Sequence, residues 1–211
     1  MLSSNLIRRF LISFLLVFGV LIIPWNGWDE YYAENFRAAG NAIFGSGSGN
    51  IELEFKSHQE TRGGSTLDSR IVIGNRSQID ADGNYPVRYL ELDTRSLGWI
   101  PTALTIALIL ATPISWPRRA RSLLGGLILV HAFILFSIAI YIWNESTGIF
   151  PAAPSATWKP LTEALQYTLI TQIGASFSVP VLIWILVVFR SNDYAVIKDL
   201  LQGTRAPVRR A

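Results

Sequence analysis

Long apolar runs and polar segments alternate along the chain, and the length of each run indicates the element it forms. Three runs reach 20 residues or more: Leu97–Trp116, Leu123–Trp143 and Tyr167–Phe189. A bilayer core about 30 Å thick requires roughly 20 apolar residues in a helix that rises about 1.5 Å per residue. A fourth run, Phe10–Ile23, is shorter. The pattern predicts a membrane α-helical bundle with four transmembrane helices.

The first run has a second interpretation. Its position behind Arg8 and Arg9 is typical of the apolar core of a cleaved secretory signal peptide. However, Pro24 and Trp25 follow the run directly, and no small-x-small cleavage pattern lies close behind it. Residues 1–25 are therefore predicted to form an uncleaved signal anchor that crosses the membrane.

Between the first two runs, residues 26–96 change their period and predict a small extracytoplasmic α+β domain. Apolar residues recur at helical spacing through Asn26–Phe44, which predicts an amphipathic helix. After the glycine-rich joint the period becomes two, because apolar and charged residues alternate through Ile51–Lys56. Arg70–Gly74 and a segment that begins at Val87 predict two further strands. Together they predict a small antiparallel sheet.

Composition narrows the chemistry. Half of the residues are hydrophobic, 16% are charged and the mean hydropathy is +0.34, values too apolar for an ordinary soluble domain. The sequence contains no cysteine, which excludes disulfides, thiol nucleophiles and cysteine-based metal sites within it. It also contains no P-loop, dinucleotide fingerprint or His-Glu-x-x-His motif. We predict no cofactor, no bound metal and no enzymatic activity.

The position of the charges predicts orientation. In the four-helix arrangement one side of the membrane carries a net charge of +8 and the other −5, although the whole chain carries only +3. Basic residues favour the cytoplasmic side, so both termini are predicted to lie there, in a bacterial inner membrane. Residues 97–189 are predicted to hold three transmembrane helices, joined by a short cytoplasmic turn at 117–122 and an extracytoplasmic loop at 144–166. Residues 190–211 form a basic cytoplasmic tail. The residues expected to determine this topology are Arg8, Arg9, Arg118, Arg119 and Arg121. Because membrane topology accounts for the net positive charge of the chain, that charge gives no support to nucleic-acid binding.

His131 is the only histidine, acidic or basic side chain in the run Leu123–Trp143. Such groups usually face the interior of a membrane bundle and often mark a proton or ligand pathway. A neutral imidazole also forms ordinary hydrogen bonds between helices, and no acidic residue lies in any predicted span. His131 is therefore the candidate intramembrane functional residue, with interhelical hydrogen bonding as the structural alternative.

The segment Asp80–Glu91 resembles a calcium loop in part of its spacing. Asp80, Asp82, Asn84 and Glu91 occupy positions 1, 3, 5 and 12. The glycine required at position 6 is replaced by Tyr85, and strands rather than helices are predicted on both sides. We expect a solvated turn here, with calcium binding as the alternative.

The segment "LDTRSLGWIPTALTIALILATPISWPRRARSLLGGLILVHAFI", Leu92–Ile134, resembles a pattern found in small bacterial membrane proteins encoded beside exosortases. Exosortases are multispanning enzymes with a cysteine nucleophile, and this chain has no cysteine. The resemblance implies an accessory role in sorting exported proteins rather than the processing step.

Two functions follow from these observations. The first is a non-catalytic membrane scaffold whose extracytoplasmic domain binds another integral membrane or envelope protein through Glu52, Glu54 and Arg88. The second is a subunit of a membrane enzyme or transport complex with a polar pathway through His131. Membrane lipid is an expected partner in both, and homo-oligomerisation stays open because Gly125 and Gly126 offer a small face for helix packing.

Overall fold

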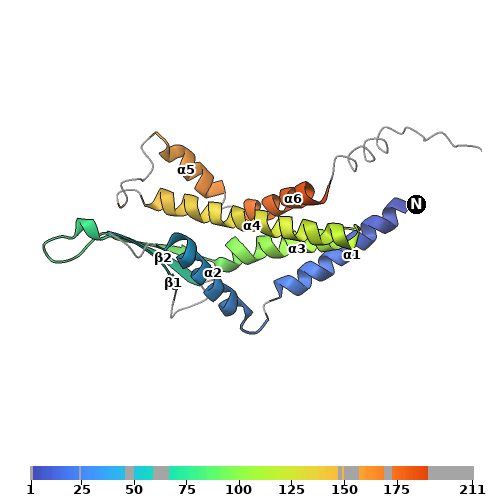
Figure 1. The fold of residues 1–211 in the computed structure, drawn as a ribbon, viewed down its shortest axis with the longest axis horizontal. Coiled ribbons are helices and arrows are strands. Elements are labelled where there is room, and N and C mark those ends of the chain that lie inside the picture. The colour runs from blue at the N-terminus through green and yellow to red at the C-terminus, as the bar shows by residue number, and fades with distance from the viewer. Residues whose placement is uncertain are drawn as a thin grey trace, which may run out of the picture.

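The computed structural model describes residues 2–23, 25–45, 50–58, 67–146, 149, 157–168 and 173–189 (Figure 1). The elements follow in the order α1 (Leu2–Ile22), α2 (Trp28–Phe44), β1 (Ile51–Ser57), β2 (Ser69–Asn75), a 3₁₀ turn (Arg76–Gln78), β3 (Val87–Leu92), a π-helical turn (Arg95–Trp99), α3 (Ile100–Ala111), α4 (Trp116–Glu145), α5 (Lys159–Gln166) and α6 (Ile173–Val188).

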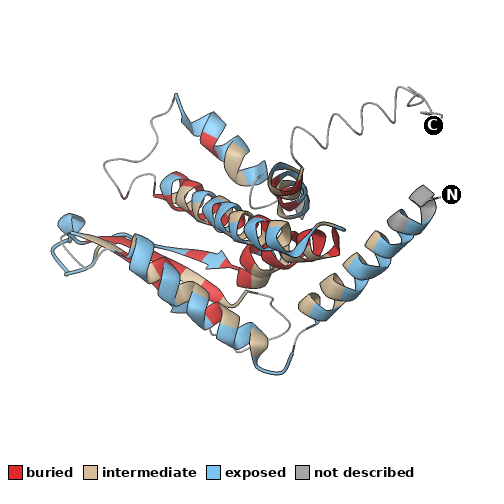
Figure 2. Cartoon of the chain, turned by 45° about the vertical axis from the view of Figure 1, so that its right-hand side comes forward, coloured by how far each residue is buried: buried red, intermediate tan, exposed pale blue. Residues whose placement is uncertain are grey.

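Helix α3 lies at the centre of the helical part and contacts α1, α4 and α6. The contact with α4 is close, since a Cβ atom at Gly126 would lie 2.6 Å from Ile109 Cδ1. Helix α1 lies at the periphery, where its described side chains are exposed or intermediate (Figure 2). Its last carbonyls accept hydrogen bonds from Trp99 Nε1 and Arg95 Nη2, at 3.0 and 2.8 Å. These bonds satisfy acceptors that a helix end leaves without partners.

Among the described residues, α4 is the one helix whose length and composition would let it cross a membrane. It contains the predicted run Leu123–Trp143 and has 30 residues in all. At about 1.5 Å per residue it is roughly 45 Å long.

The prediction of four transmembrane helices is wrong, because the other three runs form shorter helical segments. Thr112 is extended, with ψ at 131°, and Pro113 after it disfavours helical conformation at that position. Helix α3 therefore ends at Ala111 instead of continuing to Trp116. Even with the π-helical turn before it, this apolar helix covers only Arg95–Ala111.

The last and the first predicted spans fall short for different reasons. Helix α6 has 16 residues, and residues 169–172 of the predicted span lie outside the described residues. In α1 the apolar run begins only after Arg8 and Arg9, so Phe10–Ile22 provides about 20 Å of apolar helix.

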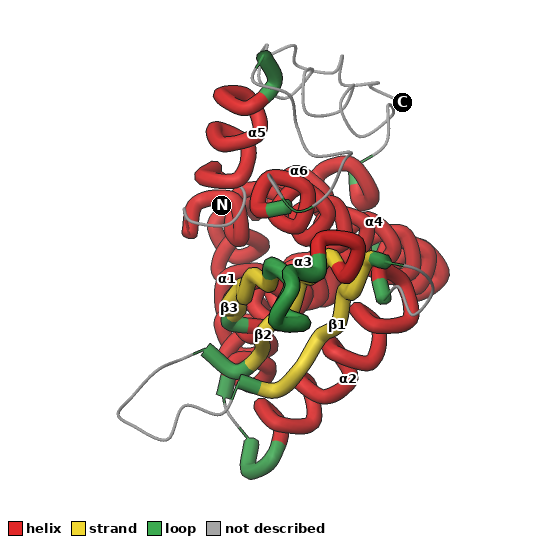
Figure 3. Tube along the Cα trace, turned by 90° about the vertical axis from the view of Figure 1, so that its left-hand side faces the viewer, coloured by secondary structure: helices red, strands yellow, loops and turns green. Residues whose placement is uncertain are grey.

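The predicted amphipathic helix and the three predicted strands are present. The strands form an antiparallel sheet in the order β1-β2-β3, in which Ile71 lies between Phe55 and Leu90. Helix α2 runs beside β1 (Figure 3). Its Gly40 is buried against the Phe55 ring, and Asn41 bonds the Phe55 backbone, accepting from its N–H at 2.7 Å and donating to its carbonyl at 2.9 Å. Asn41 thus satisfies the backbone of β1 at Phe55, on the edge that does not pair with β2.

One face of the sheet packs on the second half of α4. The shared apolar core contains Ile71, Ile73 and Leu90 from the strands and Ile134 and Ile138 from α4, all at most 4% exposed. These α4 residues recur every four positions, as expected for one face of a helix. We call α2 with β1–β3 the sheet unit, and burial of this face attaches it to α4.

Candidate functional site

The two faces of the sheet have different surroundings. Side chains alternate across a strand, so Leu53 and Phe55 share the inner face that meets α4, while Glu52 and Glu54 point the other way. We call this second side the outer face; the described helices that pack on the sheet, α2 and α4, lie against the inner face. The outer face is therefore the part of the sheet unit available to another molecule.

The outer face combines one exposed aromatic ring with charges of both signs. Tyr89 is 58% exposed, and the Arg70 guanidinium lies 5.1 Å from the centre of its ring. Arg70 also pairs weakly with Glu91 at 3.5 Å, and Lys56 pairs with Glu54 at 2.8 Å. Exposed pairs of this kind contribute little to stability, about 0–1 kcal/mol each. Tyrosine and arginine are enriched at protein interfaces, so the exposed Tyr89 ring with Arg70 over it is suited to protein binding.

The edge of β3 is also open. Asn75 N–H donates to the Pro86 carbonyl at 3.3 Å, which places Pro86 in a hydrogen-bonded pair with β2. These pairs alternate along an antiparallel strand, so the backbone groups of Val87, Tyr89 and Glu91 point away from β2. In the described part of the chain β3 pairs with β2 alone. The strand therefore offers backbone donors and acceptors beside the Tyr89 ring.

Glu52 lies at the other end of the outer face and is bound internally. Its Oε2 accepts a hydrogen bond from the Tyr85 hydroxyl at 2.7 Å and pairs with Arg76 at 3.1 Å. The Tyr85 hydrogen bond, more than the Arg76 contacts, holds the pKa of the Glu52 carboxyl below its ordinary value of 4.5. The Tyr85 ring also covers Gly74, where a Cβ would approach it to 2.9 Å. Glu52 therefore fastens the turn before β3 to the sheet.

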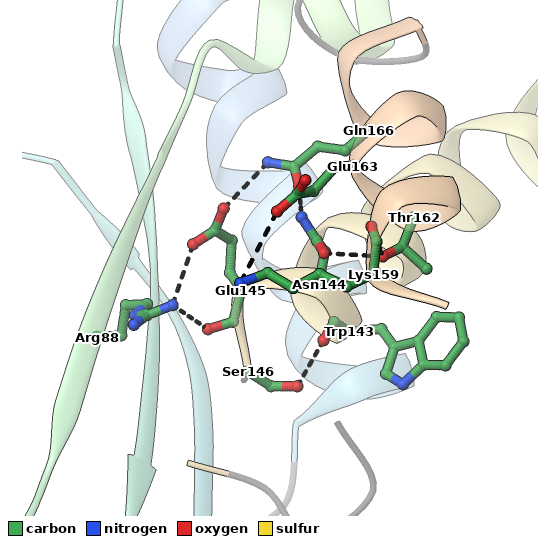
Figure 4. Close-up of polar contacts among 9 residues, drawn as sticks. All are labelled: Arg88, Trp143, Asn144, Glu145, Ser146, Lys159, Thr162, Glu163 and Gln166. Atoms are coloured by element: carbon green, nitrogen blue, oxygen red, sulfur yellow. Dashed lines mark hydrogen bonds and ion pairs between the residues drawn. The ribbon is translucent and has the colours of Figure 1, made fainter. Parts of the chain in front are cut away.

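Arg88 belongs to the opposite face and joins the sheet to the helices (Figure 4). Its Nη1 donates to the Glu145 carbonyl at 2.7 Å and pairs with the Glu145 carboxylate at 3.2 Å. Gln166 Nε2 donates to the same carboxylate at 3.1 Å, and the amide of Asn144 donates to Gln166. Thr162 completes the network through a 2.9 Å hydrogen bond to Asn144. Arg88 thus connects β3, the end of α4 and α5.

The structure does not bring the three predicted partner residues together. Glu52 and Glu54 share the outer face, but Arg88 lies on the inner face and points to α4. Of the three, Glu54 is the one on the outer face that is bonded only to its strand neighbour Lys56. The exposure of Tyr89 was not predicted from the sequence. Leu90 and Leu92 are two positions apart and share the buried face, so the residues between and before them, on the alternate positions, face the other way.

His131 lines a cavity of about 410 Å³ between α4 and α2, together with Tyr32, Asn35 and Gly40. Its Nδ1 lies 2.8 Å from the Leu127 carbonyl in the same helix. Since a carbonyl only accepts, this contact requires a proton on Nδ1. Burial, reinforced by Asp68, raises the pKa of the Tyr32 hydroxyl, so Tyr32 is a hydrogen-bond donor rather than a base. No carboxylate is among the lining residues that the structure describes.

The calcium-like segment uses its first carboxylate internally. Asp80 Oδ1 accepts backbone hydrogen bonds from Asp82 and Asn84 at 3.0 and 2.8 Å. Gly83 has a φ of 83°, which a glycine tolerates at this turn. Throughout the described residues, no group of three or more His, Asp or Glu side chains could hold a metal ion.

The predicted topology arginines lie where α1 and α4 begin. Arg118 Nη2 donates to the Val188 carbonyl at 2.6 Å, and Arg119 Nη2 donates to the Thr112 carbonyl at 2.9 Å. Arg121 bonds within α4, to Pro117 at 3.3 Å. Arg8 and Arg9 are exposed on α1. The start of α4 is therefore strongly basic and the sheet unit lies toward its far end (Figure 1).

The model of one protein family matches residues 4–191, and its description is exosortase H-associated membrane protein. The chain belongs to this family, which confirms the resemblance noted over Leu92–Ile134 and extends it to most of the sequence. No curated protein and no solved structure matches the chain.

Proposed function

We propose that this member of the family is a non-catalytic accessory subunit that holds its sheet unit against an exosortase-class membrane enzyme. The family description supports an accessory role in a protein-sorting system. The absence of cysteine and of a metal-binding cluster among the described residues is compatible with that role. The partner, rather than this chain, then carries out the processing step.

The proposed orientation places the basic start of α4 in the cytoplasm and the sheet unit outside, in a bacterial inner membrane. Arg118, Arg119 and Arg121 support this direction through the positive-inside rule. Helix α4 is about 15 Å longer than a bilayer core requires. The basic first turns of α4 account for most of this excess, and the second half of α4, which packs on the sheet, would then lead to the outer side of the membrane and hold the sheet unit there.

The observation that carries the proposal is the difference between the two faces of the sheet, of which one packs on helices and the other carries an exposed aromatic ring. The inner face is covered by α4 and α2, and Asn41 satisfies the backbone of β1 at Phe55. Glu54 and Tyr89 lie on the other face, and β3 pairs with β2 alone in the described part of the chain. A partner is therefore expected to bind there, through the exposed ring and by adding a strand to β3.

The test is crosslinking in native membranes, followed by mild-detergent purification and mass spectrometry. We expect a stoichiometric integral membrane enzyme of the exosortase class to accompany the chain. Tyr89→Asp should reduce its recovery by roughly tenfold or more, because a central aromatic at an interface contributes about 2 kcal/mol. Glu54→Lys should also reduce its recovery, because it reverses a charge on the same face. Membrane insertion of both variants should be normal.

A matched control is Glu163→Lys, a charge reversal at an exposed position on α5. It changes the net charge as much as Glu54→Lys but lies away from the outer face. Equal recovery from all three variants would contradict the proposed surface. Recovery of the chain alone would contradict the accessory role.

A further inference from the structure

Figure 1 shows that α1 passes the connection between α3 and α4 at the opposite end of the molecule from the sheet unit. A second cavity is lined by residues of α1 and of this connection. Its volume is about 580 Å³. Its polar lining consists of Asn5, Arg9 and Ser13 from α1 and Arg119 from α4. Nothing in the proposed function uses this cavity.

The charged side chains that line the cavity are all basic. Two guanidinium groups line it, and no acidic residue occurs in residues 1–28 or 94–144 of the sequence. Within the described residues Arg9 forms no hydrogen bond or ion pair. Two arginines with no acidic residue beside them in the described lining attract an anion.

Arg119 is held in place but retains binding capacity. Its Nη2 donates to the Thr112 carbonyl at 2.9 Å, and its guanidinium lies 4.7 Å from the centre of the Trp116 ring. These contacts orient the planar group. Its Nε is buried and has no hydrogen-bond partner in the described part of the chain. A buried N–H without a partner is costly, and an oxygen of a bound anion would satisfy it.

The remaining lining is apolar, which distinguishes the anion. Phe10, Leu110 and Ala111 continue the cavity from the arginines along α1 and α3. A free phosphate would leave these surfaces exposed, whereas an acyl chain attached to the phosphate would cover them. Trp116 at the start of α4 is 71% exposed, as expected for an indole at the level of lipid headgroups.

We infer that this cavity binds the phosphate of an anionic glycerophospholipid, with Arg9 and Arg119 on the phosphate and the apolar lining on an acyl chain. Basic pockets between membrane helices bind such headgroups in other proteins. The bound lipid would join α1 to the α3–α4 connection and hold the basic end of the chain at the headgroup level.

The test compares two adjacent arginines on one helix. Arg9→Gln removes a side chain that lines the cavity and that no described contact holds, so the fold should be unchanged. Arg8→Gln is the matched control, because Arg8 is exposed, carries the same charge and does not line the cavity. Each full-length variant is titrated with phosphatidylglycerol and with phosphatidylcholine in detergent, and native mass spectrometry counts the bound lipid.

We expect the wild-type chain to bind phosphatidylglycerol more tightly than phosphatidylcholine. Arg9→Gln should weaken phosphatidylglycerol binding about tenfold, since a hydrogen bond to a charged group contributes about 1.5–3 kcal/mol. Arg8→Gln should change it by less than about twofold, because Arg8 does not line the cavity and its charge acts on the bound phosphate only through solvent. Arg119→Gln should weaken binding as Arg9→Gln does.

Two results would overturn the inference. Equal losses in Arg8→Gln and Arg9→Gln would indicate a general surface charge rather than a site. The second result has two parts. Millimolar inorganic phosphate would displace phosphatidylglycerol, and in its presence the chain would bind phosphatidylglycerol and phosphatidylcholine equally. That result would assign the cavity to a free phosphate compound instead.

Discussion

Replacing Asn41 by alanine should loosen β1 without removing an apolar contact of the core. The Asn41 amide forms two hydrogen bonds with the backbone of Phe55, at 2.7 and 2.9 Å, and both are partly buried. Alanine leaves one donor and one acceptor of β1 without a protein partner. At about 1 kcal/mol for each hydrogen bond, the free energy that keeps β1 closed should fall by about 2 kcal/mol. This change corresponds to a roughly 30-fold increase in the open population.

Hydrogen exchange of the full chain in mild detergent measures this opening directly. The amide of Phe55 should exchange roughly 30-fold faster in Asn41→Ala, whereas amides in the middle of α4 should keep their protection. Asn35→Ala is the matched control, because Asn35 lies on the same helix and donates only to the Tyr31 carbonyl within it. Both substitutions change helix propensity equally, so their difference isolates the bonds to β1. Equal protection of β1 in the two variants would refute the reasoning.

Three further predictions concern single residues. Gly40→Ala should lower the free energy of unfolding by about 1 kcal/mol. A Cβ at this position would lie 2.7 Å from the Phe55 ring, and the cost of this overlap outweighs the usual gain of about 1 kcal/mol for alanine in a helix. Increased stability in a denaturant titration would contradict this packing. The lowered pKa of Glu52 means that its carboxylate, bonded to Tyr85, contributes stability above pH 4.5 that is lost as the pH falls through the folded-state pKa. The difference in melting temperature between wild type and Glu52→Gln should therefore be largest near neutral pH and shrink in acid, and a difference that is independent of pH would count against this linkage. His131→Ala should leave both partner recovery and the activity of the partner unchanged, whereas intact assembly with lost activity would favour the alternative of a polar pathway.

Local features of the fold could be predicted because they depend on local period. The alternation of apolar and charged residues through Ile51–Lys56 predicted β1, and helical spacing through Asn26–Phe44 predicted α2. Neither pattern indicated that Asn41 would complete the edge of β1. That contact requires α2 and β1 to lie side by side, which depends on packing between elements.

The number of membrane spans was overestimated because apolar length was equated with helix length. The run Leu97–Trp116 contains Pro113, which ends α3 early, and this signal was present in the sequence. The start of α4 beyond the predicted run was also readable, since Trp116 and Pro117 lie at its first turn and proline is favoured there. Breakers inside an apolar run thus decide helix length as much as hydropathy does.

The sequence by itself determined the family, the apolar character of α4, the basic charge at its start and the two-residue period of the strands, because each depends on residues close together in the chain. Only the tertiary structure decided which side chains contact another element. Glu54 and Arg88 are both charged strand residues, yet Arg88 is bonded to Glu145, 57 positions away, and Glu54 is on the outer face. The same holds for Arg8 and Arg9, of which only Arg9 lines the basic cavity. Burial and pairing are properties of contacts between distant segments, so a residue's type and spacing leave them open until the elements pack.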